Sequence, residues 1–145
     1  MKWKNDVSAL KTQENDKDVR VFLESVDNAR RRRDAFVLLD LMSEITGDPP
    51  RMWGDSIVGF GAYDYKQKNG TPGRWFLTGF SPRKAATTIY IMPGFKPYPD
   101  MMAKLGKFRT SVSCLYVTRL ENIDLAVLGS LIANSVDDMR QKYHG

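Results

Sequence analysis

One stretch of the chain decides the fold, because the spacing of its apolar residues changes there to a period of two: Ser56-Ile57-Val58-Gly59-Phe60-Gly61-Ala62-Tyr63-Asp64-Tyr65. In an extended chain, Val58, Phe60 and Ala62 share one face, and their neighbours share the other. Asn69-Gly70 and Pro72-Gly73 follow and supply a turn. The stretch therefore predicts a strand that leads into an antiparallel partner.

Residues after the turn extend this pattern. Residues 74–80 and 87–92 are rich in aromatic and β-branched side chains, so we expect a three-stranded antiparallel meander. Residues 99–105 predict a short helix closed by Gly106, and residues 113–117 predict a fourth strand. Asn122 is the predicted cap of a last helix, whose apolar stripe is Leu125, Leu128, Ile132, Val136 and Met139.

Helical spacing dominates before the turn. The stripe Val19, Phe22, Leu23 and Val26 follows Asn15 and Asp16, either of which can cap a helix. Asp27 or Asn28 restarts the pattern with Ala35, Leu38, Leu39, Met42 and Ile45, which ends at Gly47 before Pro49-Pro50. Two helices therefore precede the strands.

The whole pattern predicts an α+β fold. Two helices, three strands, a helix, a strand and a helix favour a two-layer sandwich. In it, an antiparallel sheet of four or more strands carries the helices on one face. We expect residues 1–14 to be a flexible N-terminal tail and residues 15–143 to form a single domain.

Composition places the chain among ordinary globular proteins. Its 145 residues are 42% hydrophobic and 27% charged, which suits one domain with its own core. No apolar stretch approaches the roughly 20 residues of a membrane-spanning helix, so we expect no membrane partner. The single cysteine, Cys114, cannot form an internal disulfide, and we expect a cytoplasmic location.

The net charge of +5 is unevenly distributed. Residues 1–50 carry nine Lys/Arg and ten Asp/Glu, whereas residues 66–109 carry nine Lys/Arg and one acidic residue, Asp100. A basic central segment favours anionic partners such as phosphate, nucleic acid or an acidic protein, although solvated lysine and arginine also keep a surface soluble.

The turn Ser81-Pro82-Arg83-Lys84 is the best candidate for an anion site. Pro82 fixes the turn, Ser81 can bond the local backbone, and Arg83 and Lys84 project charge at a strand end. Lys107 and Arg109 can approach the same edge. The alternative is a basic turn that protects the sheet edge or pairs with Asp55 and Asp64. Residues Arg30 to Arg33 are expected to form local helical pairs with Asp27 and Asp34.

The glycines of the deciding stretch suggest a second candidate site. Gly59 and Gly61 leave a groove that a helix, an aromatic ring or a ligand can fill. In the functional interpretation, Trp53, Tyr63 and Tyr65 form the walls of a shallow ligand cleft. In the structural interpretation, the same aromatic residues belong to the core.

Patterns typical of enzymes are scarce. The sequence has no phosphate-binding loop, zinc-ligand spacing or dinucleotide fingerprint. His144 is the single histidine and lies next to the last residue, and Cys114 sits in an apolar strand where a buried thiol is expected. We therefore predict no catalytic residues and no cofactor. Asp40 and Glu44 place two carboxylates on one helical face and form a weak candidate for iron.

Several short motifs together resemble a known family. They are Arg31-Arg32-Arg33-Asp34-Ala35, Trp53-Gly54, Gly59-Phe60-Gly61 with Tyr63 and Tyr65, Gly79-Phe80-Ser81-Pro82-Arg83-Lys84, Leu105-Gly106-Lys107 and Ser113-Cys114-Leu115-Tyr116. Their order is similar to that of the YdhG-like family, domain of unknown function 1801, over residues 16–140. The resemblance implies a small α+β domain, and some relatives are described as frataxin-like iron chaperones. Thr110-Ser111-Val112 departs from the Gly-Lys pair that the family often has.

Three functional hypotheses follow. The first is a non-enzymatic binding module for an anionic small molecule or an acidic protein, with ligand-binding residues Trp53, Tyr63, Tyr65, Ser81, Arg83, Lys84 and Lys107. The second is an iron chaperone, as the resemblance implies. The third is a nucleic-acid-binding protein that stacks bases on Trp53, Tyr63 or Trp75. We favour the first, because it uses the basic segment.

Overall fold

The computed structural model describes residues 12–143. Along the chain, its elements are β1 (Glu14–Asn15), α1 (Val19–Glu24), α2 (Ala29–Thr46), β2 (Pro50–Trp53), β3 (Ile57–Phe60), β4 (Tyr63–Lys66), β5 (Pro72–Trp75), β6 (Thr78–Pro82), β7 (Thr87–Ile91), α3 (Pro99–Lys104), β8 (Arg109–Thr110), β9 (Cys114–Val117), a 3₁₀ turn (Leu120–Asn122) and α4 (Leu125–Tyr143). Most of the predicted tail, residues 1–11, lies outside the described residues.

The strands form one large antiparallel sheet and one small hairpin. The seven-stranded sheet has the order β1-β2-β3-β6-β7-β9-β8, and β4 pairs with β5 in a separate two-stranded sheet. Every pairing is antiparallel. The α+β class and the antiparallel sheet of more than four strands are therefore confirmed.

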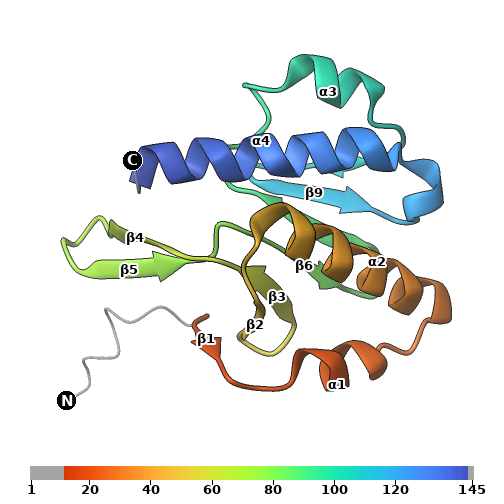
Figure 1. Cartoon of the computed structure of the whole chain (residues 1–145), viewed down its shortest axis with the longest axis horizontal. Helices are drawn as coiled ribbons and strands as arrows, with labels where there is room; N and C mark the ends of the chain where they lie inside the picture. Colours follow the sequence, from red (N-terminus) through yellow and green to blue (C-terminus); the bar gives the residue numbers. More distant parts are fainter. Residues whose placement is uncertain (1–11, 144–145) are drawn as a thin grey trace.

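The helices pack against the sheet from one side. In Figure 1, α2 and α4 cross in front of the strands, with α3 above and α1 below. Buried residues of α1, α2 and α4 share the main core with Val58, Phe60, Phe80, Ile89 and Leu115 of the strands. A second, smaller core consists of Trp53, Ile57 and Phe76, and none of the described helices contributes a residue to it. We call the side without helices the open face.

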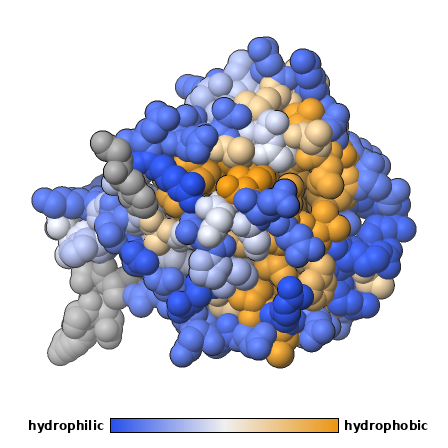
Figure 2. Space-filling view, viewed as in Figure 1, coloured by the Kyte–Doolittle hydropathy of each residue, from blue (hydrophilic) through white to orange (hydrophobic). Residues whose placement is uncertain are grey.

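Local sequence explains the long helix α2. The side chain of Asn28 accepts a hydrogen bond from the backbone N–H of Arg31 and caps the first turn. At the other end, Gly47 takes φ of 71°, a left-handed conformation that favours glycine and ends the helix. Figure 2 shows apolar side chains gathered over the middle of the helix-covered side, surrounded by hydrophilic ones.

The structure departs from the predicted strands at Gly61. The expected single strand over 56–65 is two strands, because Gly61 takes φ of 66° and turns the chain out of the large sheet. A side chain there would also collide with Leu77, since its Cβ would lie 2.6 Å from Leu77 Cδ1. Residues 74–80 divide in the same way, so β4 and β5 form their own hairpin.

Three strands and two caps were not predicted correctly. The cap of α1 is Asp18, which accepts a hydrogen bond from the Val21 N–H, and not Asn15 or Asp16. β1, β2 and β8 carry too few residues to show a period, and β2 starts at Pro50, which is tolerated as a first strand residue. Glu14, expected in the tail, pairs in β1. Asn122 belongs to the 3₁₀ turn, and Asp124 accepts the hydrogen bond from the Val127 N–H at the start of α4. Within residues 12–143, none of the helices is long and apolar enough to cross a membrane.

Candidate anion-binding site

The predicted turn joins β6 to β7 at one end of the sheet. The backbone N–H of Arg83 donates to the carbonyl of Ala86 and closes the turn. Arg83 and Lys84 are exposed, as the sequence suggested. Ser81 is fully buried, and its hydroxyl donates to the carbonyl of Ser56 at 2.6 Å, so it anchors the strand instead of facing a ligand.

Arg31 of α2 holds this turn from the side. Its guanidinium donates to the carbonyl oxygens of Arg83, of Lys84 at 3.0 Å and of Thr118 at 3.3 Å. The side chain lies in the interior, because Arg31 is only 7% exposed. Among the described residues, no carboxylate forms an ion pair with Arg31, and its Nε has no hydrogen-bond partner. The expected helical pair with Asp27 or Asp34 is therefore not formed.

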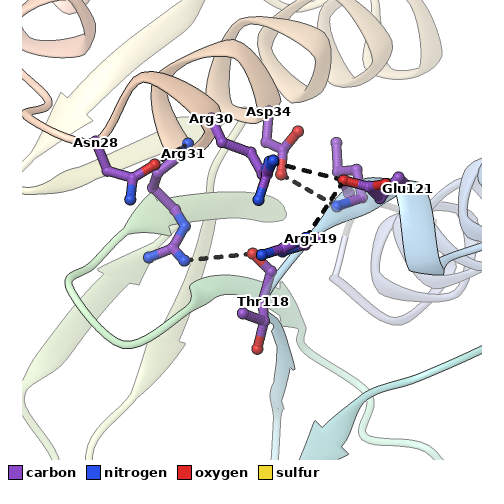
Figure 3. Close-up of polar contacts among 8 residues, drawn as sticks. Asn28, Arg30, Arg31, Asp34, Thr118, Arg119 and Glu121 are labelled. Carbon is purple, nitrogen blue, oxygen red and sulfur yellow. Dashed lines mark hydrogen bonds and ion pairs between the residues drawn. The ribbon is translucent and has the colours of Figure 1, made fainter.

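The nearby carboxylates have other partners (Figure 3). Glu121 lies 3.6 Å from Arg30 and 3.9 Å from Arg119, and Asp34 accepts a hydrogen bond from the Leu120 N–H at 3.1 Å. Two arginines thus share one exposed carboxylate, and no carboxylate in the described part of the chain pairs with Arg31.

A hollow of about 500 Å³ opens beside Arg31. We call it the basic hollow. Its lining includes Asn28, which caps α2, Arg31 of α2, Arg83 and Lys84 of the turn, and one carboxylate, Asp27. The first turn of α2 faces this space. It contains no acidic residue, although acidic residues are the ones that a helix N-terminus favours. The helix dipole and the cations thus act in the same direction and favour a bound anion.

Lys107 lies at a neighbouring position instead of in the same hollow. With Thr118, Arg119 and Asn122 it lines a second hollow of about 320 Å³. Thr118 links the two regions, because its carbonyl accepts a hydrogen bond from Arg31, which lines the basic hollow. The structure therefore places Lys107 with Arg119 at the second hollow, and Arg83 with Lys84 at the basic hollow. Asp55 and Asp64 pair with Lys17 and Arg74, so neither neutralises the turn.

Trp53 packs inside the open face. It is 1% exposed and contacts Trp75 and Phe76 edge to face, with ring centroids 5.9 and 5.5 Å apart. Gly59 makes room for this ring, because a Cβ there would lie 2.6 Å from Trp53 Cδ1. An aromatic ring of the same sheet thus fills the groove that the glycine leaves.

Tyr63 and Tyr65 lie elsewhere, with the main core. The ring of Tyr63 contacts those of Tyr143 and Tyr65 at centroid distances of 4.4 and 5.7 Å. Burial, helped by these two neighbouring hydroxyls, raises the pKa of Tyr63 to about 12. Trp53, Tyr63 and Tyr65 therefore do not line one cleft.

The structure also shows where the candidate iron ligands and the thiol of Cys114 lie. Asp40 and Glu44 are exposed on α2. Within residues 12–143, no group of three or more His, Cys, Asp or Glu side chains could hold a metal ion. Cys114 is half-buried on the open face, contrary to the expected core position. His144 lies outside the described residues.

Sequence reasoning missed Arg31 as the central residue of the site. One signal was present: four consecutive arginines occupy the start of a helix, where the dipole disfavours cations. Such a run needs partners outside its own helix. Those partners, the carbonyls of residues 83, 84 and 118, lie 52 to 87 positions away in the chain.

Comparison of the chain with protein-family models, with curated proteins and with solved structures finds no match. The resemblance to the YdhG-like family therefore stays a prediction, and any function must be argued from the site.

Proposed function

We propose that this protein is a non-enzymatic binding module whose basic hollow holds a small anion, most simply a phosphate-bearing molecule. One observation carries the proposal: the guanidinium of Arg31 is buried, and no carboxylate of residues 12–143 forms an ion pair with it. A buried charge is expensive unless it is paired, and carbonyl dipoles compensate it only in part. A bound anion supplies the missing negative charge.

The surroundings of Arg31 suit phosphate in particular. Arg83 and Lys84 add exposed cations on one side of the hollow, and the N-terminus of α2 adds backbone N–H groups on the other. The hollow is of a size for a small ligand, about 500 Å³. A carboxylate of an acidic protein could use the same cations, but it offers fewer acceptor oxygens.

The test is calorimetric titration with inorganic phosphate and with pyrophosphate at low salt. Arg83→Ala and Lys84→Ala should each weaken binding by about 1 to 3 kcal/mol, the scale of a charge-assisted hydrogen bond, with the melting temperature nearly unchanged. Lys68→Ala, in the turn between β4 and β5, is the matched control and should bind like the parent.

A gain of affinity gives a sharper check. Asp27 is the carboxylate that lines the basic hollow, so Asp27→Asn should strengthen pyrophosphate binding by a few tenths to 1 kcal/mol, about twofold to fivefold. If Arg83→Ala, Lys84→Ala and Asp27→Asn all bind phosphate and pyrophosphate like the parent, the anion binds elsewhere. Micromolar binding of ferrous iron, abolished by Asp40→Asn with Glu44→Gln, would favour the iron-chaperone hypothesis instead.

A further inference from the structure

The open face carries two partly exposed tyrosines on adjacent strands. Thr88 pairs with Tyr116, and Tyr90 pairs with Cys114, so Tyr90 and Tyr116 lie diagonally on the same face of β7 and β9. Their chain neighbours Ile89 and Leu115 point the other way and are fully buried beneath the helices. The two rings are thus set at fixed positions by the sheet.

These rings continue a band of aromatic residues across the open face. Phe76 contacts Tyr90 at 5.1 Å and Trp75 at 4.6 Å between ring centroids. Phe76 is fully buried, whereas Trp75, Tyr90 and Tyr116 keep part of their surface exposed. A buried ring supports the exposed ones, which favours a rigid surface over mobile side chains.

Cations accompany the exposed rings. Arg109 on β8 pairs with Tyr116, and its guanidinium lies 5.4 Å from the Tyr116 ring centroid. Burial raises the pKa of Tyr90, and the guanidinium of Arg83 beside its hydroxyl opposes that rise. The four strands β6, β7, β8 and β9 contain no acidic residue. Tyr90 and Tyr116 therefore lie beside positive charge, and the carboxylates near Trp53, Glu14 and Asp64, pair with Arg74.

We propose that this face binds single-stranded nucleic acid, with bases stacked beside Tyr90 and Tyr116 and with phosphates held by Arg109 and Arg83. Unpaired bases stack on aromatic rings and on guanidinium planes, and the phosphate chain requires cations along its path. The charge of the face complements a polyanion, and a regular sheet presents its rings at the spacing of its strands. A duplex keeps its bases paired and offers no exposed ring to these tyrosines.

This inference goes beyond the proposed anion site, and it can fail separately. Tyr90, Tyr116 and Arg109 do not line the basic hollow. Arg83 belongs to both regions, because its carbonyl accepts from Arg31 while its side chain lies beside Tyr90. Variants of Tyr116 and Arg109 therefore test the open face alone, and Lys84→Ala tests the hollow alone.

The experiment is fluorescence anisotropy with labelled oligo(dT) and oligo(U) of about 12 nucleotides, a length within the usual site size. Each should bind the parent protein more tightly than a labelled duplex of the same length. Tyr116→Leu should weaken binding about 5- to 150-fold, and Tyr116→Phe, which keeps the ring, should bind within about twofold of the parent. Melting temperatures establish that each variant is folded.

Arg109→Ala supplies a second readout that a destabilised variant would not mimic. Loss of one phosphate contact should reduce the slope of log K against log salt concentration by about 0.7, the value for a single strand. Arg20→Ala is the matched control, because Arg20 lies over the ring of Phe36 in the same way, 5.9 Å from its centroid, but on the helix-covered side. It should leave both affinity and slope unchanged.

The proposal would be overturned if the parent protein bound single strand and duplex with equal affinity. It would also be overturned if Tyr116→Leu and Arg109→Ala were both folded and bound the oligonucleotides like the parent. Loss of oligonucleotide binding in Lys84→Ala together with parental binding in Arg109→Ala would also overturn it, since the polyanion would then occupy the basic hollow. Binding of either oligonucleotide with the losses described above would support it.

Discussion

The two faces of the large sheet are built from the same strands but have different chemistry. On the helix-covered face, Phe80, Ile89 and Leu115 are fully buried and belong to the main core. On the open face, Tyr90 and Tyr116 are partly exposed beside Arg83 and Arg109. The helix-covered face therefore holds the main core, whereas the open face has a smaller core and leaves Tyr90 and Tyr116 partly exposed.

This difference shows how an antiparallel sheet separates two requirements within one segment. Alternation along β7 sends Ile89 to the core and Tyr90 to the surface one residue later. A change on one face thus need not disturb the other. Four predictions test how sharply the faces differ.

The largest effect is expected for Phe80→Ala on the helix-covered face. Phe80 is fully buried, so its loss leaves a cavity and should lower the free energy of unfolding by about 3 to 5 kcal/mol. Tyr116→Ala, on the open face, should lower it by less than half as much. Urea unfolding followed by circular dichroism measures both. Equal losses would mean that the open face is part of the core.

The next effect concerns Gly79, where the open face is closely packed. A Cβ at Gly79 would lie 2.5 Å from the carbonyl oxygen of Val58 and 3.1 Å from the Cα of Gly59. Both are backbone atoms that cannot move aside, so Gly79→Ala should cost about 1 to 3 kcal/mol of stability. Thermal unfolding would detect this loss as a lower melting temperature. A variant as stable as the parent would contradict the close strand packing.

A smaller effect should appear only at alkaline pH. The pKa of Tyr63 is about 12 in the folded protein and near 10 when the chain is unfolded. In the folded state, Tyr63 thus keeps its proton to a higher pH than in the unfolded chain. The free energy of unfolding therefore falls as pH rises from about 10 to about 12. Tyr63→Phe removes this group, so its stability should decline less steeply, by on the order of 1 to 2 kcal/mol over that range.

Denaturant unfolding at a series of pH values would measure this difference. Tyr116→Phe, which alters a hydroxyl on the open face, serves as the comparison. If the stability of both variants falls with rising pH as steeply as that of the parent, the burial of Tyr63 does not control the loss of stability at alkaline pH.

The smallest effect is a gain. Gly129 lies within α4, and a Cβ there would meet only Leu41 Cδ1, at an ordinary contact distance of 3.7 Å. Alanine has less freedom to lose than glycine in a helix, so Gly129→Ala should add about 0.5 to 1 kcal/mol. Differential scanning calorimetry would show a higher melting temperature. A loss instead would indicate that the helix-covered face tolerates no added methyl group at Gly129.

Much of the fold could be predicted because local signals agree with it. The cap Asn28, the stripe through Leu38 and Met42, and Gly47 define α2 from sequence alone. The β-branched residues of β7 and the proline at the start of α3 are likewise local signals for these two elements. In each case, the physical cause lies within a few residues of its effect.

The rest could not be predicted because its causes are distant in the chain. Gly61 ends β3 because its left-handed conformation turns the chain out of the sheet. The sequence shows two glycines in an alternating pattern, Gly59 and Gly61, and no local signal tells which one turns the chain. Of the predicted site residues, Arg83 and Lys84 lie at the basic hollow, whereas Ser81 and Trp53 are interior. Arg31 was expected to pair with Asp27 or Asp34 near its own helix. Arg31 finds its partners only after the chain has folded.

The ends of the sheet have a consequence for behaviour at high concentration. Its two outermost strands, β1 and β8, have two residues each. Long edge strands can recruit another chain and extend into aggregates, and short edges or charged side chains oppose this. Here the carbonyl of Asn15 already accepts hydrogen bonds from Arg51, and β8 presents Arg109. We therefore expect the seven-stranded sheet not to add strands from neighbouring molecules at high concentration.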